Sequence, residues 1–164
     1  MLFRSSAYSE VEAKEPWCTD VTPVADIGLL SSESIHQGRE NDPDAGAGRI
    51  LLENHVLFDV IDREMDFSKY RLLILPDDIP VDAELKAQLD AYIAQGGKLF
   101  LTGASGVSDD GSEIAFDIGG TIEGISPFQP DFVLPVEDVR AEFIDMPMVM
   151  YTPSQRLKVT DGES

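Results

Sequence analysis

The stretch that decides the fold is Tyr70-Arg71-Leu72-Leu73-Ile74-Leu75-Pro76, together with Gly96-Gly97-Lys98-Leu99-Phe100-Leu101-Thr102. Each stretch contains a short apolar run, which is typical of a strand that is buried on both faces of a parallel sheet. Apolar residues recur at helical spacing between Asp82 and Gln95, with Asp82 as the N-cap and the two glycines as the stop. Strand, helix and strand in this order predict a right-handed crossover and a parallel sheet.

The same alternation extends toward the N-terminus. Val24–Leu30 and Phe58–Ile61 have the apolar character of strands. Between them, Asp42-Pro43 can begin a helix, because the aspartate accepts from free amides and proline suits the first turn. Helical spacing predicts three core-facing residues in this segment, which are Ala47, Ile50 and Leu51.

The pattern changes after Gly103. Helical periodicity disappears, and turn residues separate short apolar runs at Phe132–Leu134, Met148–Tyr151 and Arg156–Val159. We expect short strands and loops packed on one edge of the sheet. The fold class is therefore α/β, a flavodoxin-like three-layer sandwich with a mainly parallel sheet and short extra strands and loops in the C-terminal third.

Both ends of the chain suggest a fragment of a larger protein. Met1–Pro16 is polar without clear periodicity, and the chain stops on the turn-like Thr160–Ser164 directly after a strand-like run. We expect residues 1–23 to be an N-terminal extension or linker from a preceding domain, and residues 24–164 to form the α/β domain.

Charge and composition exclude several classes of partner and site. Thirty-one acidic against twelve basic residues give a net charge of −19, which repels nucleic acid and anionic membranes. The single cysteine, Cys18, excludes an internal disulfide and a zinc site built on several thiolates. The chain has neither the roughly 20 consecutive apolar residues of a membrane span nor the apolar core of a secretory signal. We therefore expect a cytoplasmic location.

Ligands of open parallel sheets bind at the carboxyl ends of the strands, where the strand order reverses. The residues that follow the predicted strands at this edge define a candidate cleft. Its members are Ser32, Glu33, Asp77, Asp78, Gly103 and Ser105.

A serine or cysteine nucleophile is the first chemistry to weigh at this edge. The turn at residues 102–106 has the position of a nucleophile elbow, but alignment of the flanking residues puts Ala104 in the place of the nucleophile. Centring the motif on Ser105 loses the glycine spacing. Both histidines, His36 and His55, lie upstream, whereas hydrolases and amidotransferases have the histidine base downstream. We expect no catalytic triad.

The sequence also gives little support for catalysis by paired carboxylates or for a metal site. Asp77 and Asp78 are adjacent, so their side chains tend to point to opposite sides, as in a solvated loop. Asp109-Asp110-Gly111 is typical of a turn, since the alternating ligands of a calcium loop are missing. No phosphate-binding or dinucleotide motif is present. We expect no catalytic residue, no metal and no cofactor.

The order of elements resembles a known family. Tyr70–Asp77 and Gly96–Gly103, with Ser105-Gly106-Val107 and the acidic pair Asp109-Asp110, are similar to the class I glutamine amidotransferase-like domain that follows the catalytic barrel in some glycoside hydrolases. The best-known version is the trimerisation domain of family 42 β-galactosidases. The N-terminal Glu12–Trp17 and the C-terminal segment from Met150 resemble a related group of barrel glycosidases.

This resemblance implies a non-catalytic role. The catalytic carboxylates of such enzymes lie in the barrel, so none is carried over to this chain. The implied function is that of an accessory or oligomerisation domain of a glycoside hydrolase. Its implied partners are the catalytic barrel of the same chain and further copies in a homo-oligomer. Two alternatives stay open, a module that binds a small ligand or carbohydrate and an atypical hydrolase or amidotransferase that uses Ser105.

Overall fold

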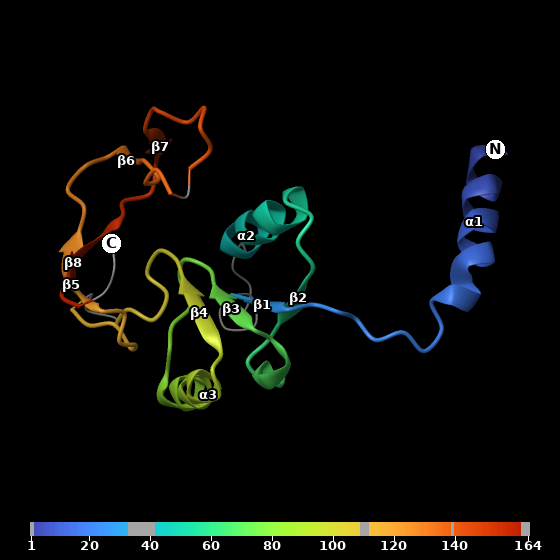
Figure 1. The fold of residues 1–164 in the computed structure, drawn as a ribbon, viewed down its shortest axis with the longest axis horizontal. Coiled ribbons are helices and arrows are strands. Elements are labelled where there is room, and N and C mark those ends of the chain that lie inside the picture. The colour runs from blue at the N-terminus through green and yellow to red at the C-terminus, as the bar shows by residue number, and fades with distance from the viewer. Residues whose placement is uncertain (1, 33–41, 109–111, 139, 162–164) are drawn as a thin grey trace.

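The computed structural model describes residues 2–32, 42–108, 112–138 and 140–161. Figure 1 shows a central sheet with one helix on either side and further elements at both ends. The helices are α1 (Leu2–Lys14), α2 (Asp42–Glu53) and α3 (Ala83–Ala94), with short 3₁₀ helices η1 (Glu15–Trp17) and η2 (Phe67–Lys69). The strands are β1 (Ile27–Leu30), β2 (Phe58–Ile61), β3 (Leu72–Leu75), β4 (Lys98–Leu101), β5 (Gly120–Ile125), β6 (Asp131–Val133), β7 (Met148–Met150) and β8 (Gln155–Val159).

The first four strands form one parallel sheet. Their order is β2-β1-β3-β4, and every neighbouring pair is parallel. The chain leaves β1 in one direction to form β2 and then crosses to the other side of β1 to form β3. This reversal is the arrangement of the flavodoxin-like sheets, so the predicted α/β class is confirmed.

The larger half of the core lies between the sheet and α3. Leu30, Leu73 and Leu75 point to this side, where they pack with Leu85 and Leu89 of the helix. Asp82 caps α3 by accepting a hydrogen bond from the Leu85 amide at 2.8 Å. The predicted helix, its cap and its core-facing leucines are therefore confirmed.

The smaller half of the core lies under α2. Leu29 and Ile74 pack there against Leu51 and Ala47, as the helical spacing predicts. The expectation for Ile50 was wrong, because its side chain is mostly exposed. Consecutive residues are separated by 100° around a helix, and α2 is oriented by the buried Asp44 and Gly48 so that Leu51 faces the sheet and Ile50 does not.

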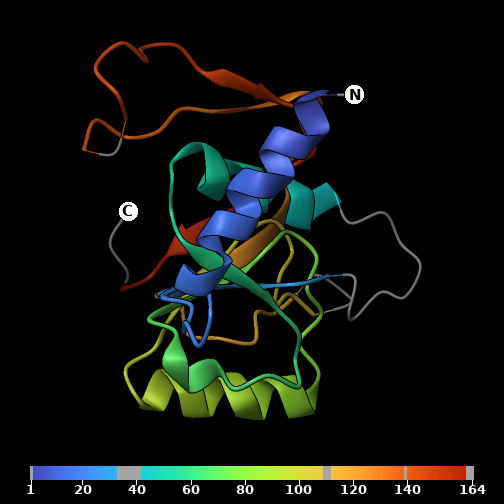
Figure 2. The same ribbon diagram turned by 90° about the vertical axis from the view of Figure 1, so that its right-hand side faces the viewer.

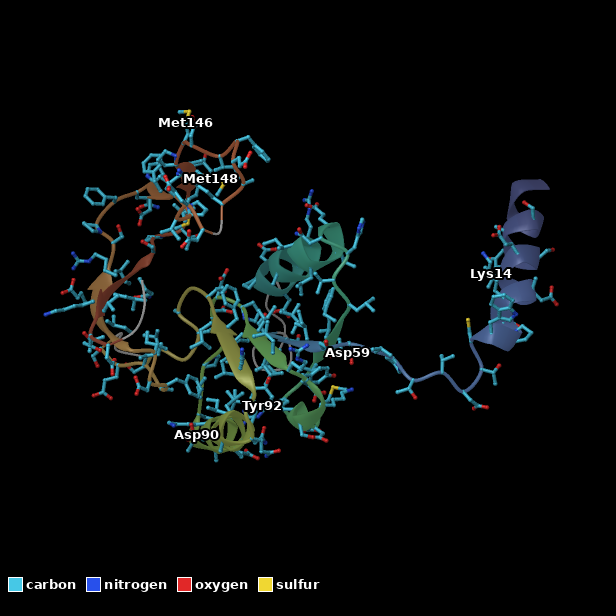
Figure 3. The ribbon with its side chains drawn as sticks, viewed as in Figure 1. Lys14, Asp59, Asp90, Tyr92, Met146 and Met148 are labelled. Carbon is cyan, nitrogen blue, oxygen red and sulfur yellow. The ribbon has the colours of Figure 1, made fainter. Side chains whose placement is uncertain are left out.

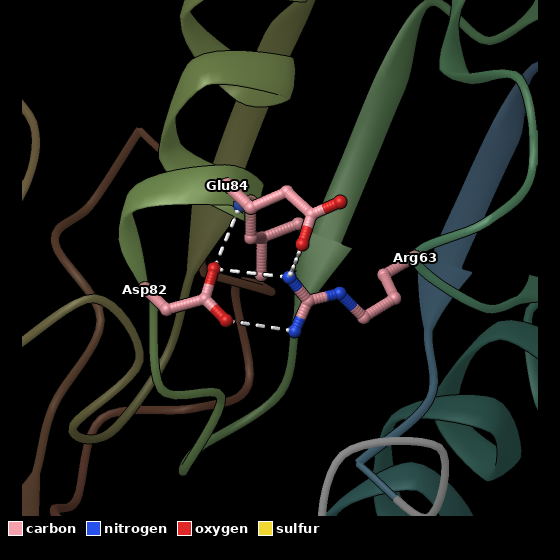
Figure 4. Close-up of polar contacts among 4 residues, drawn as sticks. Arg63, Asp82 and Glu84 are labelled. Carbon is pink, nitrogen blue, oxygen red and sulfur yellow. Dashed lines mark hydrogen bonds and ion pairs between the residues drawn. The ribbon is translucent and has the colours of Figure 1, made fainter.

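An ion-pair cluster joins the loop after β2 to the beginning of α3 (Figure 4). The guanidinium of Arg63 donates to both carboxylate oxygens of Asp82, at 2.9 and 3.0 Å, and reaches Glu84 at 3.3 Å. The hydrogen bonds from Arg63 hold the pKa of the Asp82 carboxyl below its usual range. Asp82, which caps α3, is therefore also fixed by Arg63, a residue that lies outside the helix.

The C-terminal third contains the short extra strands that the sequence predicts, and they do not join the parallel sheet. Its strands form two separate antiparallel ribbons, β5–β8 and β6–β7. Of the described residues after β4, those of the linking segment enter the α3-side core, through Phe116. The base of the β6–β7 ribbon is held by Asp131, which accepts from the hydroxyl of Ser154.

The N-terminal segment also differs from the expectation of a segment without periodicity, because Leu2–Lys14 is helical. Helix α1 buries none of its described side chains, and an extended segment separates it from the sheet (Figure 1). Within the helix, Lys14 bonds Glu10 one turn earlier at 2.7 Å. Such a helix lacks the apolar stripe on which prediction from periodicity depends.

We predict opposite effects for two glycine substitutions. A Cβ at Gly97 would lie 2.2 to 2.4 Å from the ring of the buried Tyr92. Gly97→Ala should therefore lower the free energy of unfolding by about 1 to 3 kcal/mol. A Cβ at Gly46, in the exposed part of α2, meets nothing within 4 Å, so Gly46→Ala should raise it by up to about 1 kcal/mol. Urea unfolding followed by circular dichroism measures both, and equal effects would contradict the packing described for Tyr92.

A second prediction concerns acid. Hydrogen bonds from Ser154, then Ser126 and the Phe132 amide, lower the pKa of the Asp131 carboxyl to about 2. A lowered pKa stabilises the folded ribbon above the ordinary value of 3.8, and this contribution is lost as the pH falls from there toward about 2. Amide exchange of the β6–β7 ribbon should accelerate over this window, and Asp131→Asn should remove that part of the pH dependence. An unchanged profile in the variant would refute the assignment.

Candidate functional site

The candidate cleft lies at the carboxyl edge of the sheet, beyond the ends of β1, β3 and β4. The structure describes five of its six predicted members, and Glu33 lies outside the described residues, as do His36 and Asp109-Asp110. The described members differ in exposure. Ser32 and Ser105 are buried, Asp78 is half-buried, and Asp77 and Gly103 are exposed.

Ser32 is held by a carboxylate that the sequence analysis did not select. The amide of Ser32 donates to both oxygens of Asp44 at 3.0 Å, and the hydroxyl of Ser31 donates to the same carboxylate at 2.8 Å. Asp44 lies in the first turn of α2 and is buried. This carboxylate therefore joins the end of β1 to the helix that follows it.

Asp77 and Gly103 are brought together by the pairing of β3 with β4. The Asp77 amide donates to the hydroxyl oxygen of Thr102 at 2.9 Å, and that hydroxyl donates to the Asp77 carboxylate at 2.7 Å. A Cβ at Gly103 would lie 2.7 Å from the backbone of Asp77. The close approach of the two loops explains why a glycine with a φ of +57° stands there.

Ser105 has a structural partner. Its side-chain oxygen accepts a hydrogen bond from the Ile79 amide at 3.1 Å, and only 2% of the residue is exposed. The Gly106 amide donates to the Ile79 carbonyl, which adds a second link between the same two loops. The hydroxyl of Ser105 therefore satisfies a buried backbone group and is not presented to solvent.

The surroundings of Ser105 lack the parts of a nucleophile elbow. Residues 103–106 form turns, and Val107 then enters an isolated bridge with Ile114, where an elbow would continue into a helix. His55 follows the end of α2 and precedes β2, so it lies at the amino edge of the sheet, opposite Ser105. Among the described residues, neither the turn nor a nearby histidine supplies triad geometry.

The described residues contain no group of three or more histidine, cysteine, aspartate or glutamate side chains that could hold a metal ion. Nor do they include a helix with the length and apolar character needed to cross a bilayer. A surface depression of about 390 Å³ is lined by residues 112–117 and 120–122, in the segment that follows the turn after β4. Its aromatic side chain, Phe116, is buried and offers no open ring face for a sugar.

Two residues that organise the edge were missed by the sequence analysis, Asp44 and Thr102. Asp44 follows the predicted helix start Asp42-Pro43, and a carboxylate in a first helical turn is a recognisable partner for loop amides. Thr102 was assigned to the end of a strand, and its contact with Asp77 depends on the register of β3 and β4. Only the first of these two had a signal in the sequence.

Comparison with known proteins identifies the domain type. The family model described as the β-galactosidase trimerisation domain matches residues 49–141. β-Galactosidase GalA of Bacillus licheniformis is 36% identical over 93 residues, which cover 53% of this chain and 14% of the relative. The chain thus spans about a seventh of the length of that curated relative.

Two solved structures extend the similarity over most of the chain. α-L-Fucosidase isoenzyme 2 from Paenibacillus thiaminolyticus is 38% identical, with a TM-score of 0.89 over 96% of this chain and 25% of that one. A cold-adapted β-galactosidase from Rahnella sp. R3 has a TM-score of 0.61 over 84% of this chain and 24% of that one, and at 19% identity it supports the fold alone. The family match covers more than half of the chain, which therefore belongs to the β-galactosidase trimerisation domain family.

Proposed function

We propose that this chain is the accessory, oligomerisation domain of a glycoside hydrolase whose catalytic barrel belongs to the same polypeptide. The observation that carries the proposal is the family match over residues 49–141. The carboxyl edge agrees with it, because Asp44, Thr102 and Ser105 are all engaged in hydrogen bonds between loops. A domain of this kind contributes contacts between subunits, and the chemistry takes place elsewhere.

Two relatives that differ in their sugars support a proposal for the substrate class. One is a β-galactosidase that matches about half of the chain, and the other is an α-L-fucosidase that matches nearly all of it. We propose that the whole protein cleaves a terminal glycoside of one of these two kinds. The greater coverage and identity favour the α-L-fucoside.

Three finer features belong to the same proposal. The strand order and the turn with Ala104 support a relationship to class I glutamine amidotransferases in which the nucleophile is absent. The exposed α1 and the extended segment after it support residues 1–23 as the connection to a preceding domain and residues 24–164 as the domain itself. A cytoplasmic location agrees with the free, exposed Cys18.

The assembly role is tested on the full-length protein that contains this chain. Sedimentation equilibrium should give a mass of three subunits, and hydrolysis of p-nitrophenyl α-L-fucoside should exceed that of the β-D-galactoside. A monomer at every practical concentration would refute the assembly role. Turnover of neither glycoside would refute the substrate class.

The alternative that Ser105 is a nucleophile makes a different prediction. Loss of the bond to the Ile79 amide should make Ser105→Ala less stable by about 1 to 3 kcal/mol, with kcat per folded molecule unchanged. Thr102→Val, which removes the bond to Asp77, is the matched control and should behave in the same way. A fall in kcat of about a thousandfold or more in Ser105→Ala alone would establish the alternative.

A further inference from the structure

The β6–β7 ribbon and the described residues of the loop between its strands, 134–138 and 140–147, form an apolar arm. Phe132 and Val149 are cross-strand partners on one face of the ribbon, with Val133 and Met148 on the other, and all four are exposed. The described loop residues continue this surface, and Phe143 is 85% exposed. Figure 3 shows Met146 and Met148 at the outer end of the arm. A two-stranded ribbon of this kind is at best marginally stable without a partner.

A second apolar surface lies on β4. Leu99 and Leu101 point into the α3-side core, so Lys98 and Phe100 point to the opposite face of the sheet. Helix α2 covers the middle strands on that face and leaves Phe100 55% exposed. Lys98 forms no ion pair with any described residue. We call Lys98 and Phe100 the β4 face.

The arm and the β4 face are separate surfaces on the same side of the sheet. Figures 1 and 2 both place the arm on the side of α2, away from α3. A trimer with threefold symmetry cannot be built from a patch that contacts its own copy, because contacts of that kind close as dimers. Each subunit of a trimer must instead offer two different surfaces that fit one another. Among the described residues, the arm and the β4 face are two surfaces of this kind.

The charges on the two surfaces are complementary. Glu142 and Asp145 flank Phe143 on the exposed arm loop, and neither forms an ion pair with a described residue. Lys98 stands two residues from Phe100 on the same face of β4. In a chain with a net charge of −19, a lysine that has no ion pair with a described residue and lies beside an exposed aromatic ring is a specific place for an acidic, aromatic segment to bind.

We propose that the arm of one copy packs on the β4 face of the next, with Phe143 against Phe100 and the acidic loop beside Lys98, so that three head-to-tail contacts close a ring. This assignment rests on the proposed oligomerisation function and adds which surfaces meet. Contacts of buried aromatic side chains dominate the affinity of most interfaces. Phe143 and Phe100 should therefore each be essential for assembly.

The first experiment uses single substitutions in the full-length protein. Phe143→Asp on the arm and Phe100→Asp on the β4 face should each weaken self-association by at least about tenfold in sedimentation velocity. Val60→Asp is the matched control, because Val60 on β2 is 59% exposed on the same face of the sheet at its opposite edge. The control adds the same charge and should leave the assembly intact. Equal loss in the control would overturn the assignment to β4.

Mixing the two defective variants gives the decisive result. The arm variant retains an intact β4 face and the β4 variant retains an intact arm, so a mixture can form one head-to-tail contact. At a concentration at which each variant alone is monomeric, we expect the mixture to form a heterodimer, which also shows that both variants are folded. A mixture that stays monomeric would overturn the head-to-tail arrangement, since contacts between two arms cannot be rescued in this way.

The proposed function and this assignment can fail separately. If the unmodified protein is monomeric, the oligomerisation function itself fails. If it is a trimer and both variants remain trimers, the function stands and the surfaces assigned here are wrong. Trimers of lower thermal stability in the arm variant would mean that the arm packs on another part of its own chain, which also overturns the proposal.

Discussion

The structure depends on the burial of β3 on both faces. Leu73 and Leu75 point toward α3, and Ile74 points toward α2, so this one strand belongs to both halves of the core. A strand with two buried faces needs a helix on each side, and the right-handed crossovers β1-α2-β2 and β3-α3-β4 supply them. The strand order, the layers and the position of the carboxyl edge follow from this requirement.

The two helices cover the sheet unequally, and the outer strands show the result. α3 completes a large cluster with η2 and the segment around Phe116, whereas α2 covers only the middle of its face. Val60 and Phe100, at the two outer strands, consequently remain exposed on that face. An isolated domain with this arrangement exposes apolar surface where a larger assembly has room for another element.

Local signals predicted the sheet and α3 well, because period, cap and stop all agree between Asp82 and Gly97. They failed where the outcome depends on orientation or on distant partners. Ile50 has the right spacing for a core residue but is turned outward by the packing of its helix. Helix α1 has no apolar stripe that periodicity could reveal. The strands β3 and β4 were predicted, yet the contact of Thr102 with Asp77 after them depends on strand register, which composition does not encode.

The tight turn at residues 103–106 has a consequence for the chemistry that this edge could acquire. In enzymes with a nucleophile elbow, the helix after the strand directs its free amides at the reactive atom and favours the anion. Here the backbone after β4 turns back to bond Ile79 and then pairs with Ile114. A cysteine introduced at Ala104 would gain a thiol without those amides. Restoring a reactive centre would require rebuilding the connection as well as changing the residue.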